Sequence, residues 1–217
     1  MNRRHLLAAL GLSPLVAKAT EEGLTPRQTA GPFHPSIDQA DKDLDLTRVT
    51  GRTGRAQGEV IQIQGQIRDQ KGQPVPKATV EIWQANKVGR YAHPNDTNKA
   101  ALDPDFQGWG IVTADDKGKY QFLTIKPGAY PAGAGWERPP HIHFTIKCLG
   151  YHELTTQLYF DGEKLNDIDK ILLDTAAAER KSLIVKFAPA QDPKEGKILL
   201  GEFNIVLRKA GEGKEKS

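Results

Sequence analysis

The chain has 217 residues, of which 38% are hydrophobic and 26% are charged. That length suits one sizeable domain and is short for two. The formal net charge of +3 gives no broad basic field of the kind that indicates nucleic-acid binding. The 21 glycines and 14 prolines favour many short strands and turns over long helices. A single cysteine, Cys148, excludes a disulfide within the chain.

Residues 1–19 have the features of an export signal. Arg3 and Arg4 precede an apolar run over residues 6–12, and the segment ends in "AKA", which fits the small-x-small rule for signal cleavage. The arginine pair indicates the twin-arginine type of signal, and with it a periplasmic location. A basic N-terminus followed by a short apolar helix is the alternative. Because the segment holds three lysine or arginine residues and no acidic ones, the chain beyond it has no net charge.

The rest of the chain divides into an arm, a domain and a tail. Residues 20–57 are polar and contain "TPRQTAGPFHPS", which is typical of an extended arm. Residues 58–210 carry the strand patterns and form the predicted domain, and residues 211–217 form a frayed tail. Beyond the signal, no stretch approaches the ~20 apolar residues that a membrane span needs, so we expect no membrane association.

Alternation of apolar and polar residues predicts the first two strands. In "EVIQIQGQIRD", residues 59–69, isoleucines alternate with glutamines, which is the period-2 pattern of a half-buried strand. Gly65 occupies one position of the apolar face, where it predicts a bulge or a close approach of another backbone. "ATVEIWQA", residues 78–85, alternates in the same way.

The later segments complete an all-β pattern. "WGIVTA" and "YQFLTI" flank the turn "DDKGK" and predict a hairpin in which Gly118 supplies a positive φ. Three further strands are expected, at residues 141–150, 155–160 and 202–208, and two short helical segments, at residues 165–174 and 175–183. Short strands with frequent turns predict an antiparallel β-sandwich with an extended N-terminal arm and one or two short helices near the C-terminus.

Two histidines in "RPPHIHF", residues 138–144, are the first candidates for chemistry. Side chains alternate between the faces of a strand, so His141 and His143 project to the same side, while Ile142 and Phe144 face a core. Two prolines fix the start of the strand. This geometry suits chelation of a metal, and a hydrogen-bonded histidine pair is the equal alternative.

The usual additional metal ligands are missing from the sequence. There is no second cysteine, no HExxH motif and no acidic triad near the histidine pair. Tyr91, in "WQANKVGRYAHPND", and Tyr130, in "IKPGAYPAGAGWERPPHIHF", each lie in a loop rich in glycine and proline that follows a strand. A loop tyrosine considered alone is more often a half-buried amphipathic residue than a ligand.

Five motifs in order connect these residues. They are "TAGPF", "EIWQAN" followed by "GRY", "TIKPGAYP", "RPPHIHF" and "TQLYF", spread over residues 25–160. The combination resembles the intradiol ring-cleavage dioxygenases, and within them most closely the protocatechuate 3,4-dioxygenase type. Several motifs in order at compatible spacing are far more specific than any one of them.

The resemblance implies a ligand set and a cofactor. In that family a non-haem ferric ion is held by two tyrosinates and two histidines, which match Tyr91, Tyr130, His141 and His143 of this chain. Ferric iron is a hard cation that prefers anionic oxygen donors and accepts imidazole nitrogen. A phenol becomes such a donor when the metal displaces its proton, because ligands bind in the deprotonated form.

The resemblance also implies a reaction. The family uses O2 to cleave a catechol between its two hydroxyl-bearing carbons, which gives a cis,cis-muconate-type product. Tyr91 matches the ligand that leaves the metal when the substrate binds, Arg138 matches an arginine that stabilises charge on the substrate, and Gln157 matches a glutamine beside it. Read alone, Arg138 fits an ordinary surface arginine, and Gln157 a polar residue on the solvent face of a strand.

The expected partners are therefore a small catechol and O2, without nucleic acid or membrane, and a homo-oligomer is left open. The identity of the catechol is also open, because this chain departs from the protocatechuate type in two places. Pro131 is followed by "AGAG" where an aromatic residue is common, and His34 follows "TAGPF". His34 could contact a substrate carboxylate or lie in solvent, and Trp136 could wall the pocket or simply pack.

A non-catalytic binding module is the rival interpretation. "GQIRDQKGQPVPKATVEIW" resembles the opening of transthyretin-like and carboxypeptidase-associated β-sandwiches, many of which are interaction domains. Fold alone does not choose between the two, because function resides in the site. The two tyrosines, two histidines and one arginine in family order favour the enzyme.

Overall fold

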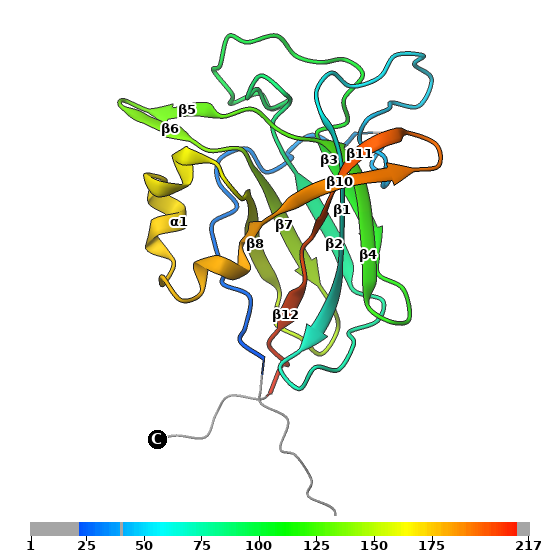
Figure 1. Ribbon diagram of the computed structural model, residues 1–217, viewed down its shortest axis with the longest axis vertical. Helices are drawn as coiled ribbons and strands as arrows, with labels where there is room; N and C mark the ends of the chain where they lie inside the picture. Colours follow the sequence, from blue (N-terminus) through cyan, green and yellow to red (C-terminus); the bar gives the residue numbers. More distant parts are fainter. Residues whose placement is uncertain (1–21, 40, 212–217) are drawn as a thin grey trace, which may run out of the picture.

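The computed structural model describes residues 22–39 and 41–211. Two β-sheets pack face to face, and a short helical segment containing α1 lies beside one of them (Figure 1). The predicted export signal at residues 1–19 and most of the predicted tail lie outside the described residues. Within the described ranges, no helix is long and apolar enough to cross a membrane.

The first sheet is built around the long strand β1. β11 and then β12 pair with one edge of β1, β4 pairs with its other edge, and β10 pairs with β11. The strands are β1 (Val60–Asp69), β4 (Lys119–Ile125), β10 (Phe187–Asp192), β11 (Gly196–Glu202) and β12 (Ile205–Leu207).

The second sheet has the order β3-β2-β7-β8-β9, and β5 with β6 forms a separate two-stranded ribbon. The strands are β2 (Thr79–Trp83), β3 (Trp109–Thr113), β5 (Tyr130–Gly133), β6 (Trp136–Arg138), β7 (His141–Lys147), β8 (Leu154–Phe160) and β9 (Ile184–Val185). Between β8 and β9 the chain makes three short helical turns: η1 (Lys164–Asp167), α1 (Lys170–Asp174) and η2 (Arg180–Ser182).

The predicted all-β sandwich with an arm and short helices is confirmed, with one difference in strand direction. β1 pairs in parallel with β11 and β12, and β8 pairs in parallel with β9, so both sheets are mixed. Parallel neighbours need a crossover connection, and these strands meet only after long excursions of the chain. Alternation identifies a strand and its faces, but carries no information on the direction of its neighbour.

The predicted hairpin at residues 109–125 is wrong. β3 pairs with β2 and β4 pairs with β1, so the turn between them crosses from one sheet to the other. The turn itself is as expected, with Gly118 at φ +71°. The Gly118 carbonyl accepts a hydrogen bond of 2.8 Å from the Ile67 amide, which ties the crossing to β1. The local signal for a turn was therefore correct, whereas strand pairing was decided by the packing of the two layers.

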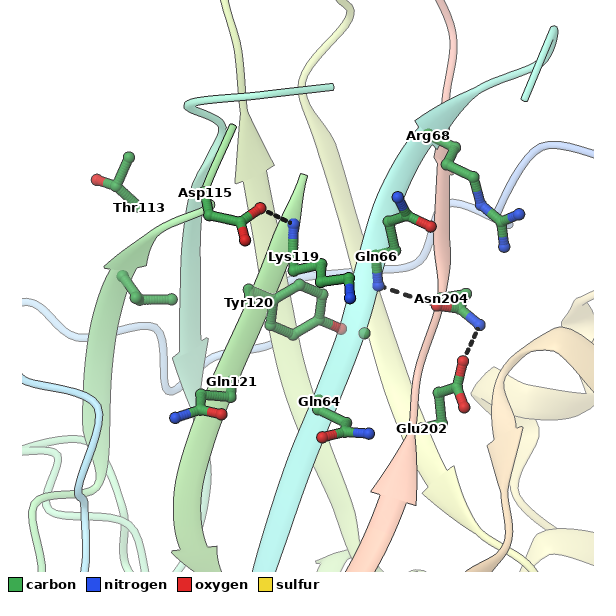
Figure 2. A pocket seen from close by; sticks show the side chains of 12 residues that line it. Gln64, Gln66, Arg68, Thr113, Asp115, Lys119, Tyr120, Gln121, Glu202 and Asn204 are labelled. Atoms are coloured by element: carbon green, nitrogen blue, oxygen red, sulfur yellow. Dashed lines mark hydrogen bonds between the residues drawn. The ribbon is translucent and has the colours of Figure 1, made fainter. Parts of the chain in front are cut away.

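Gly65 marks a close backbone approach, one of its two predicted roles. A Cβ atom there would lie 2.0 Å from the Phe203 carbonyl oxygen. The backbone amide of Gln66 donates to the Asn204 side chain at 2.9 Å. The predicted strand at residues 202–208 is interrupted at this point, where β11 ends and β12 follows. Figure 2 shows Asn204 beside Gln66 in a pocket whose lining residues are all outside the candidate site.

The face of β7 opposite the core is also buried. Ile142, Phe144 and Ile146 point into the core and are fully buried, as alternation predicted. His141 and His143, on the other face, are 2% exposed. The arm covers this side of the sheet, and the backbone amide of Gln28 donates to the Thr155 carbonyl on β8 at 2.8 Å. Polar residues are thus placed in a closed space between sheet and arm.

Candidate active site

The register of the second sheet aligns the polar residues in rows. Trp83 of β2 lies opposite His143 of β7, which lies opposite Gln157 of β8. His141 lies opposite Tyr159 in the next row. Residues directly opposite one another on antiparallel strands point to the same face at about 4.5–5.5 Å between Cβ atoms. The sheet therefore holds these side chains at fixed positions on its covered face.

The two imidazoles lie side by side in different surroundings. Their ring centroids are 4.9 Å apart. His141 donates from Nδ1 to the Pro139 carbonyl at 2.7 Å, which leaves the Nε2 lone pair free to act as an acceptor or ligand. The indole of Trp83 stacks on His143 at 4.8 Å, with the rings 5° from parallel. The Nδ1 atom of His143 is buried without a hydrogen-bond partner among the described residues.

The two tyrosines converge on the histidines from separate loops. The rings of Tyr91 and Tyr130 are perpendicular, with centroids 5.5 Å apart, and both residues are at most 6% exposed. The Tyr91 hydroxyl lies 3.5 Å from Nε2 of His141, and the Tyr130 ring lies 5.6 Å from the ring of His141. Two phenols and two imidazoles thus share one buried space.

Two glycines hold the tyrosine loops together. Gly89, at φ +75°, passes so close to the second loop that a Cβ atom would lie 2.2 Å from the Ala129 carbonyl oxygen. A Cβ atom on Gly128 would lie 2.5 Å from the Lys87 carbonyl oxygen. The Gly128 amide donates to the Asn86 carbonyl at 2.9 Å. Only residues without a side chain allow this contact, which sets the separation of Tyr91 and Tyr130.

The arm closes the remaining side of the site. Phe33 packs against Tyr91 with ring centroids 4.8 Å apart, and against Tyr130 at 6.1 Å. Gly31, at φ +68°, lies over His143, where an added Cβ atom would be 3.4 Å from Cε1 of the imidazole. The "TAGPF" motif therefore supplies part of the wall of the site.

Arg138 is buried beside the imidazoles and makes a dense set of hydrogen bonds. It is 3% exposed, and Asp169, which is fully buried, accepts from Nε at 3.1 Å and from Nη2 at 3.0 Å. Gln157 accepts from Nη2 at 2.9 Å, and Nη1 lies 3.0 Å from Nε2 of His141. The alternatives of a surface arginine and of a solvent-facing glutamine are both wrong, because Gln157 is also fully buried.

Burial decides the protonation of the four rings. It raises the pKa of Tyr91 well above that of a free phenol, an effect to which Tyr130 adds and which the Arg138 charge opposes. It also raises the pKa of Tyr130, against the charge of Arg138. Burial and then the Arg138 charge lower the pKa of His141 and His143 well below their usual value. Without a further cation the phenols stay protonated and the imidazoles neutral.

Known proteins resemble this chain over most of its length. A family model described as dioxygenase matches residues 30–209. The protocatechuate 3,4-dioxygenase beta chain of Burkholderia cepacia is 43% identical over 188 residues, which cover 84% of this chain and 78% of that protein. The chain belongs to the intradiol ring-cleavage dioxygenases.

Other members of the intradiol dioxygenase family are longer. Catechol 1,2-dioxygenase 1 of Acinetobacter lwoffii is 31% identical over 89% of this chain and 65% of its own length. The solved structure of catechol 1,2-dioxygenase from Acinetobacter sp. ADP1 is 26% identical, with a TM-score of 0.65, over 87% of this chain and 64% of its own. This dioxygenase therefore spans just under two thirds of those relatives. Membership of an enzyme family also removes the support for the rival binding module.

The residues that the sequence singled out lie together in this intradiol dioxygenase, whereas the residues around them were missed. The structure brings together Tyr91, Tyr130, His141, His143, Arg138 and Gln157. Tyr159 was missed, although it follows Gln157 by two residues in β8 and therefore shares its face. Asp169 and Gln28 were also missed, because no spacing rule connects a helix cap or an arm residue to a distant arginine.

Two residues left open by the sequence lie at the edge of the site. His34 is partly exposed, and its Nε2 atom lies 3.4 Å from Oε1 of Glu81, with its ring against the edge of Trp83.

Trp136 carries the Lys170 ammonium over its ring at 5.1 Å and the Arg138 guanidinium at 5.9 Å. Residues 132–135, at the tip of the two-stranded ribbon formed by β5 and β6, are exposed. Neither His34 nor Trp136 contacts the four central rings of this dioxygenase as closely as Arg138 does.

Proposed function

We propose that this chain uses a non-haem ferric ion and O2 to cleave a catechol-type ring between its hydroxyl-bearing carbons. The convergence of two buried phenols, two buried imidazoles and a buried guanidinium on one face of the second sheet carries the proposal. The product of such a cleavage is a cis,cis-muconate-type diacid. Membership of the intradiol family supports the same reaction.

The donor set fits ferric iron and fits few other ions. In the described part of the chain, no group of three or more His, Cys, Asp or Glu residues could hold a metal. A metal in this space would be bound by Tyr91, Tyr130, His141 and His143. Two phenolates with two neutral imidazoles suit a hard trivalent cation.

The side chains have distinct roles in this scheme. A bound ferric ion would supply Lewis acidity that favours the deprotonated catechol and withdraws electron density from its ring. Tyr91, whose oxygen lies 3.5 Å from Nε2 of His141, would be a phenolate with the ion bound, and the phenolate would take a proton from a catechol hydroxyl. Arg138, kept charged by its hydrogen bonds to Asp169, offers Nη1 to charge that develops on the substrate. The arm residues Gly31 and Phe33 exclude water.

Oxygen uptake across a panel of catechols tests the proposal. Iron-loaded protein should consume O2 with at least one of catechol, protocatechuate, hydroxyquinol and larger polyphenols, and the product spectrum should be that of a muconate-type diacid. Protocatechuate comes first in the panel because the Burkholderia relative is named for it. Tyr91→Phe should lower uptake sharply and Tyr120→Phe should not, because Tyr120 is a buried tyrosine bonded to Phe203, outside the site. No uptake with any compound would contradict the proposal.

A further inference from the structure

A buried ion pair links Arg138 to the helical segment after β8. Asp169 accepts two hydrogen bonds from the guanidinium, through Oδ1 and Oδ2, in the bidentate arrangement that fixes the orientation of the planar group. The same carboxylate caps α1 by accepting from the Leu172 amide at 3.0 Å. The start of α1 and the direction of Arg138 are therefore set by one side chain.

Tyr159 is the second contact that fixes the guanidinium. Its hydroxyl accepts from Nη2 of Arg138 at 3.0 Å and lies 3.2 Å from the side-chain oxygens of both Gln157 and Gln28. A hydroxyl has one proton, so it donates to one of these oxygens while it accepts from Arg138. Its ring lies along that of His141, with centroids 6.0 Å apart and an angle of 30°. Tyr159 thus contacts both the guanidinium and an imidazole.

Gln28 of the arm joins this network to α1 from the other side. Its side-chain nitrogen donates to Thr175 at 3.0 Å and to the Ile171 carbonyl at 3.4 Å, while its oxygen lies beside Tyr159. Gln157 also reaches the arm, by donating to the Thr29 carbonyl at 3.0 Å. Three segments far apart in sequence, the arm, β8 and α1, therefore meet around one guanidinium.

The network determines which guanidinium nitrogen faces the site. Nε and Nη2 are occupied by Asp169, Gln157 and Tyr159, and only Nη1 is directed at His141. Rotation of the group would break several buried hydrogen bonds at once, and leaving buried polar groups unpaired is costly. Loss of one of these contacts would leave Arg138 charged but would let the guanidinium turn, so that Nη1 is no longer held toward His141.

We propose that Tyr159 and Asp169 are positioning residues, which act on the reaction by holding Arg138 with Nη1 toward the substrate. The inference rests on the proposed function, because Arg138 must act on a bound substrate for its orientation to matter. Preorganised charge accelerates a reaction only when it is held where charge develops in the transition state. Loss of the positioning contacts should therefore lower kcat more than it raises KM.

Tyr159→Phe tests the proposal with the smallest change. It removes one hydroxyl and keeps the ring that packs on His141. We expect kcat to fall by about 10-fold, with KM within about 2-fold and the iron content unchanged. Tyr120→Phe is the matched control, because it also removes the hydroxyl of a buried tyrosine, here bonded to the Phe203 carbonyl at 2.6 Å. Both variants should lower the Tm by about 2–4 °C, and only Tyr159→Phe should lower kcat.

A double-mutant cycle shows whether Tyr159 acts through Arg138. Arg138→Lys keeps a positive charge but lacks the rigid fork that Asp169 and Tyr159 orient. If Tyr159 is a positioning residue, adding Tyr159→Phe to Arg138→Lys should change kcat by less than about 2-fold. Asp169→Asn is the second variant, in which the asparagine keeps the helix cap while the bidentate carboxylate is lost. It should lower kcat further than Tyr159→Phe does.

The outcomes separate this inference from the proposed function. An active wild type in which Tyr159→Phe leaves kcat unchanged overturns the inference and leaves the function standing. The same holds if Tyr159→Phe lowers kcat as strongly in the Arg138→Lys background as in the wild type. A folded, iron-loaded wild type without oxygen uptake overturns both.

Discussion

Tyr130 and His143 show what a bound cation would change in this space. Burial raises the pKa of the phenol and lowers that of the imidazole, so that both are uncharged in the protein alone. A phenol becomes a strong ligand only after it loses its proton, which a trivalent ion would promote. The protein therefore supplies the donor atoms, and the ion would supply the charge that activates them.

Replacement of either residue should remove the metal. Tyr130→Phe deletes an oxygen donor and His143→Ala deletes a nitrogen donor, while the sheet and loops that carry them stay in place. We expect the iron content per chain, measured by elemental analysis after reconstitution, to fall at least about 10-fold in each variant. Tyr120→Phe should bind iron as the wild type does. Full iron content in the first two variants would show that the ligand set is different.

Asp169 should matter for stability as well as for activity. Asp169→Asn leaves the buried guanidinium of Arg138 without its counter-charge, which typically costs about 3–5 kcal/mol. Urea unfolding of the purified protein measures this directly. Asp174→Asn, on the exposed side of the same helix, is the control and should change the stability by less than about 0.5 kcal/mol. Equal stabilities for the two variants would contradict the importance of the buried pair.

At the scale of elements, periodicity predicted strands and their faces well and their partners poorly. The alternation around Ile142 placed both histidines on one face of β7, as observed. The turn at Gly118 was also predicted, but β3 and β4 belong to different sheets. Pairing depends on contacts between distant segments, to which a local pattern does not respond. The hairpin β10–β11 was missed for a different reason, because its strands show little alternation of apolar and polar residues.

The contact between the two tyrosine loops leaves no room for a side chain at Gly89. Gly89→Ala would place a methyl group 2.2 Å from the Ala129 carbonyl oxygen, at a φ of +75° that alanine rarely adopts. We expect the loops to separate, the stability to fall by at least about 1 kcal/mol, and iron binding to weaken.

Gly133→Ala is the matched control for this loop contact. Gly133 lies on the ribbon that begins with Tyr130, has no positive φ, and has no atom within 4 Å of an added Cβ. Circular dichroism melts and iron analysis on the two variants compare the sites directly. Wild-type iron content in Gly89→Ala would mean that the spacing of the loops is not critical.

At the scale of the whole molecule, the arm decides how much of the site could be predicted. The candidate ligands come from strands and loops with recognisable motifs, so their grouping could be predicted, and their role as ligands stays a prediction. The cover provided by Gly31 and Phe33, and the bond from Gln28 to Tyr159, depend on where a segment without regular structure lies on the sheet. No periodicity encodes that path, and only the three-dimensional fold reveals it.

The export signal at residues 1–19 stays a prediction. If residues 1–19 are a twin-arginine signal, replacing Arg3 and Arg4 together by lysine should retain the protein in the cytoplasm. Fractionation of cells followed by immunoblotting measures the distribution. A lysine-to-arginine change at exposed Lys194 should have no effect. Undiminished periplasmic protein in the Arg3 and Arg4 variant would contradict this type of signal.

The visible absorption spectrum of the iron-loaded protein shows whether two tyrosinates bind the ion. Two tyrosinates bound to a ferric ion absorb in the visible by charge transfer from ligand to metal, so the wild type should be coloured. Anaerobic addition of a catechol that serves as substrate should shift the band, because its oxygens would change the set of donors around the ion. Tyr130→Phe should lose the band and Tyr120→Phe should keep it. A colourless protein that nevertheless holds one iron per chain would contradict the tyrosinate–histidine site.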